Sequence, residues 1–450
     1  MIKQTKVKPI FKEEKEYLEN KLGIELPKDC WTRGGGTRYV FLDIYSKIPY
    51  IKFVVHDNGK YEIIKDNRER LKKYKSKGIS ETLDYERDRI NDQWNNDIKR
   101  TVEFVAEHRD IPYNISISGG KDSEVLYNLW KEVLTKLDFM PEYEFIFFNT
   151  SNEVPEVYRY IKERKDIRII NPQIGWHQYI KDKGYLLPTV FNRFCCSVYK
   201  EGQVKKQYDN KSARVQVIGM RTNESVKRSR YSFYMDYDFE KKLYGSSNIP
   251  QKWVKLCPLI DWTTTDIWLI VLIKRFFVNQ KYKNGFQRVG CNICPYSSPY
   301  EDDLNRHYYP HLWHRFEELA RQSYRLHQVA QISGYTEQEY INGIWKHQKS
   351  KSLTYLNKKP TDENIQAFAD YKGLSFEMAK KFWNRICGEC GKKMNPTEIS
   401  MFYKIDGRKE NEEDNRKPIC KKCFCKKNNL TDRQYFQMAK EFKDSGCNLF

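Results

Sequence analysis

The sequence predicts an α/β fold in which a parallel sheet is covered by helices on both faces. Two observations support this prediction. β-rich runs alternate with helical segments from residue 113 to about 276, which is the order that a parallel sheet requires. The run EFIFF at 144–148 is almost wholly apolar, as expected of a strand buried on both faces.

The elements follow one another in a regular order. Upstream of the alternating segment, residues 80–109 carry apolar residues at three- and four-residue steps, which predicts one amphipathic helix. Residues 38–42 and 48–55 are strand-like and lie near glycine and Asn-Gly turn signals. Within the alternating segment, strands are expected at 113–118, 144–150, 166–170, 214–220 and 254–260, and helices at 124–137, 155–164 and 264–276.

Four regions are predicted along the chain. Residues 1–80 form a small N-terminal α+β module, and residues 81–300 form the α/β domain. Residues 301–385 are helical in pattern and rich in aromatic residues, without strands. Residues 386–450 form a small cysteine-bearing module.

Composition excludes several classes of protein. With 450 residues, 39% of them hydrophobic, the chain has enough apolar material for a core and is not disordered as a whole. We find no apolar run of membrane-spanning length and no apolar leader, so we expect a cytoplasmic protein without a membrane partner. The net charge of +20 favours nucleotides or nucleic acid as partners, unless it reflects a biased genome composition.

One segment carries the signature of a phosphate site. The sequence SGGKDS lies directly between a predicted strand and a predicted helix, where backbone N–H groups and the positive helix end meet. The glycines admit close approach of a phosphate, the lysine supplies positive charge and the aspartate is a candidate ligand for Mg²⁺. The residues are Ser118, Gly119, Gly120, Lys121, Asp122 and Ser123.

Here the chain resembles the ATP pyrophosphatases, the adenine nucleotide α-hydrolases with a PP-loop. More narrowly, it is similar to the phosphoadenosine phosphosulfate (PAPS) reductase family. Four further motifs support the resemblance in the family's order: FNTSNEVPE at 148–156, NRFCCSVYK at 192–200, GMRTNESVKR at 219–228, and PLIDW at 258–262 followed by DIW at 266–268.

The resemblance implies an ATP site with Mg²⁺. Lys121, Asp122 and Arg221 are its expected catalytic residues, and Thr150 and Gly219 join the loop and Arg221 in binding ATP. Glu224 and Arg228 are expected at the substrate. Asn149 stands where the family has an aspartate, so any metal or ribose role of that position is in doubt.

The first cysteine set is interpreted through the same family. Adjacent cysteines followed by a CxxC pair resemble the ligands of a [4Fe–4S] cluster, which needs four thiolates. Zinc on the same four thiols and buried cysteines without a metal are the alternatives. The residues are Cys195, Cys196, Cys291 and Cys294.

The second cysteine set predicts zinc from its spacing alone. Two CxxC pairs separated by 29 residues are typical of a zinc ribbon or treble clef. The expected ligands are Cys387, Cys390, Cys420 and Cys423, and the nearby Cys425 is able to replace Cys423. The basic stretch 416–427 is either a nucleic-acid contact or a solvated face.

Three functions remain open at this level. The first is an enzyme that cleaves ATP to an adenylate and pyrophosphate and activates a substrate for sulfur transfer, on nucleic acid as in DNA phosphorothioation. The second is a sulfonucleotide reductase that forms sulfite, for which Cys447 is the candidate nucleophile. The third is a nucleotide-sensing, DNA-binding regulator. DNA or RNA and a sulfur-donor protein are the expected partners, and the sequence names neither the acceptor nor the oligomeric state.

Overall fold

The chain divides into two compact units in a computed structural model. The first unit joins Met1–Leu326 with Gln338–His347, and the second joins His327–Glu337 with Gln348–Phe450. The region boundaries predicted from the sequence stay predictions. The structure describes residues 3–208, 211–226, 228–244, 247, 249–348, 355, 358–359, 361–383, 387–392, 394–405 and 418–444.

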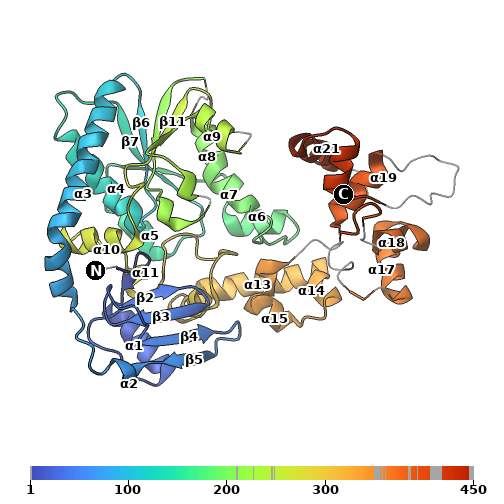
Figure 1. Ribbon diagram of the computed structural model, residues 1–450, viewed down its shortest axis with the longest axis horizontal. Helices are drawn as coiled ribbons and strands as arrows, with labels where there is room; N and C mark the ends of the chain where they lie inside the picture. The colour runs from blue at the N-terminus through green and yellow to red at the C-terminus, as the bar shows by residue number, and fades with distance from the viewer. Residues whose placement is uncertain are drawn as a thin grey trace. The chain divides into compact units, whose positions relative to one another are not determined.

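The first unit contains a six-stranded sheet, which confirms the predicted α/β fold (Figure 1). The strand order is β10-β11-β9-β6-β7-β8, in which five strands run parallel and β10 is an antiparallel edge. All five expected strands are present. Each ends at the residue where the sequence predicted its end, or before it. Their bounds are β6 Tyr113–Ser116, β7 Tyr143–Phe148, β8 Ile167–Ile170, β9 Arg214–Val217, β10 Tyr234–Met235 and β11 Trp253–Leu256.

Helices lie on both sides of this sheet, with α3 on one side and α7 and α8 on the other (Figure 1). The long helix α3 buries Ile90, Trp94 and Ile98, which recur at four-residue steps and face α4 and α10. The bounds are α3 Ile79–Glu107, α4 Lys121–Leu134, α5 Pro155–Lys162, α6 Trp176–Asp182, α7 Phe194–Cys196, α8 Gly202–Gln207, α9 Tyr237–Tyr244 and α10 Thr264–Ile273.

The N-terminal residues form a second, antiparallel sheet with strands in chain order. Its inner face holds a buried ion group in which Glu14 pairs with Lys8 and, at 3.1 Å, with Arg38. One continuous apolar core runs from Val7 to Tyr309, so both sheets share it. The bounds are β1 Lys8–Pro9, α1 Lys12–Leu22, β2 Trp31–Gly34, β3 Thr37–Phe41, β4 Ile51–Val55, β5 Tyr61–Asp66 and α2 Arg68–Leu71.

The remaining elements are helical. The first unit also contains α11 Gln280–Lys283, α12 Pro299–Tyr308, most of α13 Pro310–His327, most of α15 Glu337–Asn342 and the 3-10 helix η4 Ile344–His347. The helix α14 Val329–Ile332 belongs to the second unit. The second unit has its own apolar core and contains α17 Asp362–Lys372, α18 Phe376–Trp383, α19 Pro396–Ile405, α20 Lys421–Lys427 and α21 Asp432–Asp444. Of the helices that the structure describes, none has the length and apolar character needed to cross a membrane.

Candidate functional site

The SGGKDS loop lies where the chain order of the parallel sheet reverses. From β6 the chain continues to β7 and β8 on one side, whereas β9 and β11 lie on the other side of β6. In open parallel sheets, ligands bind outside the carboxyl ends of the strands at such a point. The loop follows the carboxyl end of β6, and Gly219 and Arg221 follow that of β9.

The loop backbone is shaped to present its N–H groups. Gly119 has a φ of 74°, and a Cβ there would lie 3.3 Å from a valine side chain, so glycine suits this position. Helix α4 begins at Lys121, and the N–H groups of a first helical turn have no partner within the helix. The N–H of Ser118 donates to Ser123 Oγ at 3.1 Å, and this hydroxyl donates to the Gly120 carbonyl at 2.9 Å. The Ser123 hydroxyl therefore stabilises the loop itself in this structure.

An ion network lies beside the loop. Lys121 Nζ is 2.7 Å from one Asp122 oxygen, and Arg221 Nε is 2.7 Å from the other. Arg221 is 2% exposed and also donates to Thr264 Oγ1 at 3.2 Å. A Cβ at Gly219 would lie 3.1 Å from the Asp122 carbonyl oxygen. Residues from the ends of β6 and β9 thus meet across the crevice between the two strands.

Burial and the opposite charges both act on the pKa values within the network. Burial raises the pKa of Asp122, but Lys121 and Arg221 outweigh it, so the net pKa of that carboxyl is lowered. Burial lowers the pKa of Lys121, which the nearby Asp122 partly offsets. Glu224 accepts from the Arg221 N–H at 3.1 Å and pairs with Arg228. The predicted catalytic and substrate residues therefore form one connected group.

Tyr282 packs directly against the loop, and no sequence motif pointed to it. The N–H of Lys121 donates to the Tyr282 hydroxyl at 3.0 Å, and a Cβ at Gly120 would lie 3.2 Å from that oxygen. Burial raises the pKa of Tyr282, so its hydroxyl stays protonated and keeps a proton to donate. A phosphate at the loop would lie beside this hydroxyl.

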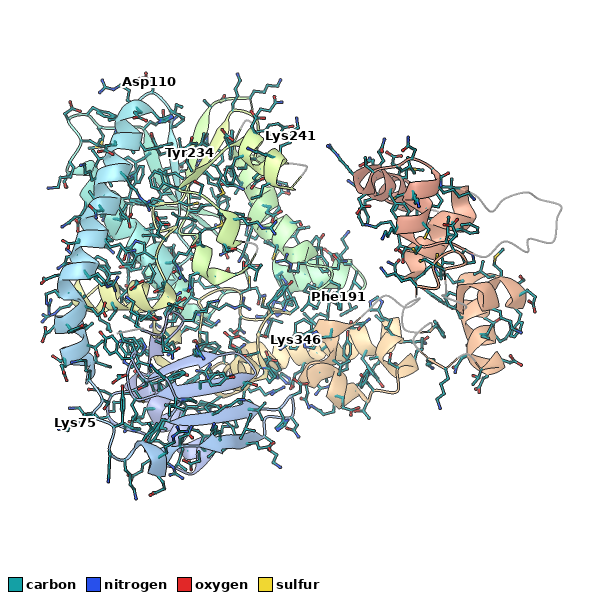
Figure 2. The ribbon with its side chains drawn as sticks, viewed as in Figure 1. Lys75, Asp110, Phe191, Tyr234, Lys241 and Lys346 are labelled. Carbon is teal, nitrogen blue, oxygen red and sulfur yellow. The ribbon has the colours of Figure 1, made fainter. Side chains whose placement is uncertain are left out.

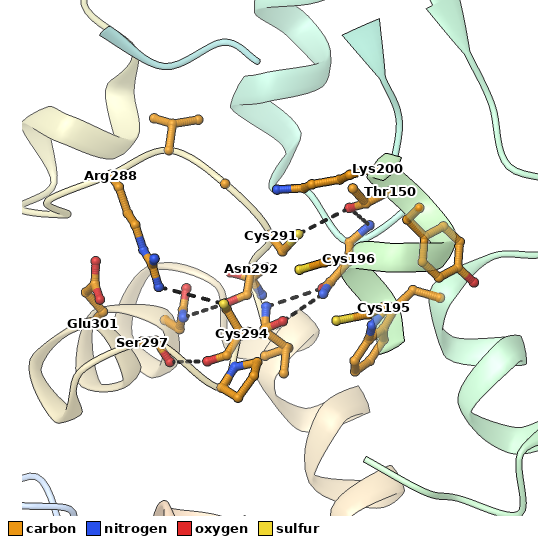
Figure 3. Close-up of a pocket in the computed structure, with 18 of the residues that line it drawn as sticks. Thr150, Cys195, Cys196, Lys200, Arg288, Cys291, Asn292, Cys294, Ser297 and Glu301 are labelled. Carbon is orange, nitrogen blue, oxygen red and sulfur yellow. Dashed lines mark hydrogen bonds between the residues drawn. The ribbon is translucent and has the colours of Figure 1, made fainter. Parts of the chain in front are cut away.

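A cavity of about 150 Å³ contains the first cysteine set (Figure 3). Cys195 and Cys196 reach it from α7, and Cys291 and Cys294 reach it from the loop between α11 and α12. Within the described part of the chain, no three of these sulfurs lie within 4.8 Å of one another. A single zinc ion, with Zn–S bonds of about 2.3 Å, would hold its sulfurs within about 4.6 Å. In this structure these four thiols therefore do not form the compact arrangement of a single-ion site.

Basic side chains surround these thiols. Arg288 donates to Cys294 Sγ at 3.7 Å, and Arg193, Lys200 and Lys281 also line the cavity (Figure 3). Lys281 is 3% exposed. Positive charge favours the thiolate form, which is the form that binds metal.

The thiols respond to these charges. The hydrogen bond between the adjacent thiols lowers the pKa of Cys196 to about 6, assisted by Lys200, and raises that of Cys195. Burial raises the pKa of Cys291, whereas Lys200 lowers it. The cavity therefore holds thiols and cations together, a donor set that suits an anionic metal cluster.

The nucleotide loop and the cysteine cavity share one wall. Val289 lines the cavity, and its Cβ lies 3.7 Å from where a Cβ of Gly120 would be. Lys281, which also lines the cavity, directly precedes Tyr282. The segment 281–291 therefore borders both the SGGKDS loop and the cavity.

Comparison with known proteins agrees with this geometry. Residues 112–297 match the sequence model of the phosphoadenosine phosphosulfate reductase domain. Over this segment, which is less than half of the chain, the protein is similar to the PAPS reductase domain family. Members of that family are enzymes.

Three relatives illustrate the similarity. An uncharacterised protein of Methanocaldococcus jannaschii is 26% identical over 291 residues, which are 63% of this chain and 59% of that protein. Adenosine 5'-phosphosulfate reductase 2 of Bacillus subtilis is 24% identical over 165 residues, 35% of this chain and 64% of the reductase. The structure of PAPS reductase from Candida auris covers 42% of this chain and 86% of that chain, at 14% identity and a TM-score of 0.33. The chain thus spans less than two thirds of the length of either sequence relative.

The segment after β7 connects the PAPS reductase domain's two sites. Thr150 donates to Glu153 at 2.6 Å and lies 3.5 Å from Cys291 Sγ, so this predicted ATP contact lines the cysteine cavity. Ser151 has a φ of 56°, where the family pattern has glycine, and its Oγ accepts from a backbone N–H at 2.6 Å. Asn149 donates to Asn171 at 2.8 Å and accepts from the Ser151 N–H at 2.7 Å, a structural role.

Two buried asparagines of the PAPS reductase domain and its flank hold the CxxC loop. Asn152 donates to the Ile293 carbonyl at 2.9 Å and accepts from the Ile293 N–H at 3.3 Å. Asn305 donates to the Asn292 carbonyl at 3.0 Å. Sequence analysis missed both, because a buried amide that satisfies a backbone leaves no spacing pattern.

The second cysteine set lies outside the PAPS reductase domain and forms a tighter group. The sulfurs of Cys387, Cys390, Cys420 and Cys423 all lie within 4.8 Å of one another. Cys390 Sγ is 3.6 Å from Cys420 Sγ, a separation that a single tetrahedral ion accommodates. Cys425 is buried in the apolar core of the second unit and is not part of this group. Cys447 and the first residues of the basic stretch, 416–417, lie outside the described residues.

Proposed function

We propose that the chain is an ATP pyrophosphatase that converts ATP to an adenylate and pyrophosphate and so activates an acceptor for sulfur transfer. The observation that carries the proposal is the Lys121–Asp122–Arg221 network at the point where the sheet order reverses. The complete Gly-Gly-Lys-Asp-Ser sequence beside it supports phosphate binding. The cysteine cavity adjoins the loop, and its thiols support a role in sulfur transfer.

In the proposed reaction, an acceptor oxygen attacks the α-phosphorus of ATP. The bond from this phosphorus to the bridging oxygen of the β-phosphate breaks, and pyrophosphate leaves with the bonding electrons. Lys121 and Arg221 turn from Asp122 to the phosphates and stabilise the developing charge. Asp122 is thereby released and is the chain's candidate ligand for Mg²⁺.

The second proposed step is displacement of AMP from the activated acceptor by a sulfur nucleophile. Cys195, Cys196, Cys291 and Cys294 would hold a [4Fe–4S] cluster, which supplies sulfur-binding and redox chemistry when bound. Arg193, Lys200 and Arg288 would balance its negative charge. The second cysteine group would hold a structural Zn²⁺.

Nucleic acid is the proposed acceptor, as in DNA phosphorothioation. The net charge of +20 and the exposed Lys422 and Lys426 beside the second cysteine group support a polyanionic partner. A reducing cytoplasm would keep the thiols available for metal.

Product analysis tests the proposal. Anaerobic protein is incubated with ATP or with a sulfonucleotide, and the products are separated. Pyrophosphate and AMP from ATP support the proposal. Sulfite from adenylyl or phosphoadenylyl sulfate would instead indicate the reductase, which the similarity to the Bacillus subtilis enzyme favours. Nucleotide binding without turnover would indicate a regulator.

A further inference from the structure

We propose that Lys346 is a positioning residue that clamps together the two segments carrying the cysteines of the cavity. Lys346 lies in η4, beyond the end of the PAPS reductase domain at residue 297 (Figure 2). The inference rests on the proposed metal-binding role of this cavity. It assigns a function to a residue that belongs to no recognised motif.

The Lys346 side chain holds the segment that follows the CxxC pair. Its Nζ donates to the Ser297 carbonyl at 2.8 Å and pairs with Asp302. The side chains of Lys346 and Asp302 are 3% and 2% exposed, so the pair is shielded from water. Ser297 Oγ in turn lies 2.8 Å from the Cys294 carbonyl and 2.6 Å from Asp302 Oδ1. The buried ammonium is thus linked to Cys294 through one residue.

The Lys346 backbone holds the segment that precedes the adjacent cysteines. Its carbonyl accepts from the Val190 N–H at 2.8 Å. The Val190 carbonyl accepts from the Tyr296 hydroxyl at 3.2 Å, and the Arg193 guanidinium lies 5.1 Å from the centre of the Tyr296 ring. Lys346 therefore bonds to both cysteine-bearing segments, and Tyr296 adds a direct link between them.

This placement has a consequence for metal binding. A cluster with four ligands needs the two segments at a fixed separation, and each cavity segment brings only two thiols. Outer partners that orient metal ligands typically change metal affinity by roughly 10- to 100-fold when they are lost. Loss of the clamp is expected to weaken cluster retention in that range, while the nucleotide loop is unaffected.

A paired substitution separates positioning from stability. Lys346→Met alone would leave Asp302 charged and buried without its partner, which destabilises a protein by itself. Lys346→Met with Asp302→Asn removes both charges and cuts the bond to Ser297. Lys255→Met with Glu240→Gln is the matched control, because Lys255 pairs with the buried Glu240 at 3.2 Å and neither residue lines the cavity.

The experiment uses the full chain and two readouts. The first is the alkylation rate of the cavity cysteines in metal-free protein, mapped by mass spectrometry. The second is the rate of iron loss to a chelator after anaerobic purification. We expect the paired variant to show faster alkylation of Cys291 and Cys294 and faster iron loss, with unchanged ATP affinity. Parental rates for both readouts, or the same change in Lys255→Met with Glu240→Gln, would overturn the proposal.

Two further outcomes are distinguishable. If the parent protein binds no iron, the proposed cluster is contradicted, and the alkylation rates still decide whether Lys346 clamps the segments. If the paired variant does not fold, Tyr296→Phe replaces it, because Tyr296 is 48% exposed and its hydroxyl is another bond of the clamp. Unchanged alkylation of Cys195 and Cys196 in Tyr296→Phe would then overturn the clamp.

Discussion

Lys121 and Arg221 hold opposite oxygens of the same carboxylate, that of Asp122. An incoming phosphate must therefore compete with Asp122 for both cations, and the cations are in place before the nucleotide arrives. Both cations would have to turn from Asp122 before they could stabilise the charge that develops on the phosphates. In the proposed reaction the loop therefore acts together with Arg221, which lies 99 positions from Asp122 along the chain.

The first prediction concerns the loop lysine. Lys121→Ala should weaken ATP binding by about 1.5–3 kcal/mol, the contribution typical of a hydrogen bond to a charged group, which is roughly 10- to 100-fold in affinity. Titration calorimetry with ATP measures it. Lys131→Ala on the same helix is the control, because Lys131 is half exposed and pairs with Asp166 at 3.4 Å. Equal affinities of the two variants would contradict the role assigned to the loop.

A second prediction concerns pH and a buried carboxyl. Burial raises the pKa of Asp97 to about 6 from an ordinary 3.8, although Arg100 and a hydrogen bond from Trp262 lower it. Between pH 4 and 6 the folded state therefore binds more protons than the unfolded state, so this group's contribution to stability falls as pH rises. Asp97→Asn does not titrate. Relative to the parent, its free energy of unfolding should therefore rise by roughly 2 kcal/mol between pH 4 and pH 7.

Urea unfolding at pH 4, 5, 6 and 7 measures this difference. Asp261→Asn is the control, because Asp261 also contacts Arg100, at 2.9 Å, but its side chain is 64% exposed. A constant difference between parent and Asp97→Asn across the range would show that the Asp97 carboxyl has an ordinary pKa.

At the level of elements, the two cysteine groups differ in how they are built. The first draws its thiols from a helix and a loop far apart in sequence, and surrounding cations and asparagines hold them. The second draws on two CxxC turns whose sulfurs already lie close together. Spacing alone predicted the compact group, because each CxxC turn presents two thiols to one point.

A third prediction tests the compact group. Cys423→Ser should lower zinc content from one ion per chain to near zero at a moderate chelator concentration, because three thiolates bind zinc less tightly than four. Cys425→Ser should retain zinc, since Cys425 lies outside the group. Elemental analysis after dialysis against chelator measures both. Retention by Cys423→Ser and loss by Cys425→Ser would show that Cys425 is the ligand instead.

The sequence predicted those elements that show both a clear apolar period and clear turn residues. The strand, glycine turn and helix around residue 119 were predicted because period and turn residues agree there. The edge strand β10 has only two residues, and α1 is mostly charged, so neither has a clear apolar period. Tyr282, Asn152 and Lys346 act through contacts between distant segments, which a single sequence does not encode in any spacing.

At the level of the whole molecule, the charge is spread over two units with separate cores. In the second unit, α20 carries exposed Lys422 and Lys426, while Lys421 is bonded to Asp432 at 2.5 Å and lies over the Phe436 ring. An exposed aromatic ring beside lysines is a feature of surfaces that bind single-stranded nucleic acid.

A fourth prediction follows for nucleic acid. Lys422→Ala with Lys426→Ala should weaken binding to single-stranded DNA or RNA and reduce the salt slope by about two, because about one counterion is released per phosphate contact. Binding measured over a range of salt concentrations tests it. Lys99→Ala with Lys136→Ala, exposed in the first unit, removes the same charge and is the control. If the two double variants show identical salt slopes, the α20 lysines do not contact nucleic acid and form only a solvated surface.

Attack at the α-phosphorus of ATP leaves a distinct isotope pattern in the products. The full chain is incubated anaerobically with ATP in water enriched in ¹⁸O, without an added acceptor, so that water takes the acceptor's place. We expect ¹⁸O in the phosphoryl group of AMP and none in pyrophosphate. Label in inorganic phosphate, with ADP as the other product, would contradict the account, because the chain would then cleave ATP at the γ-phosphate.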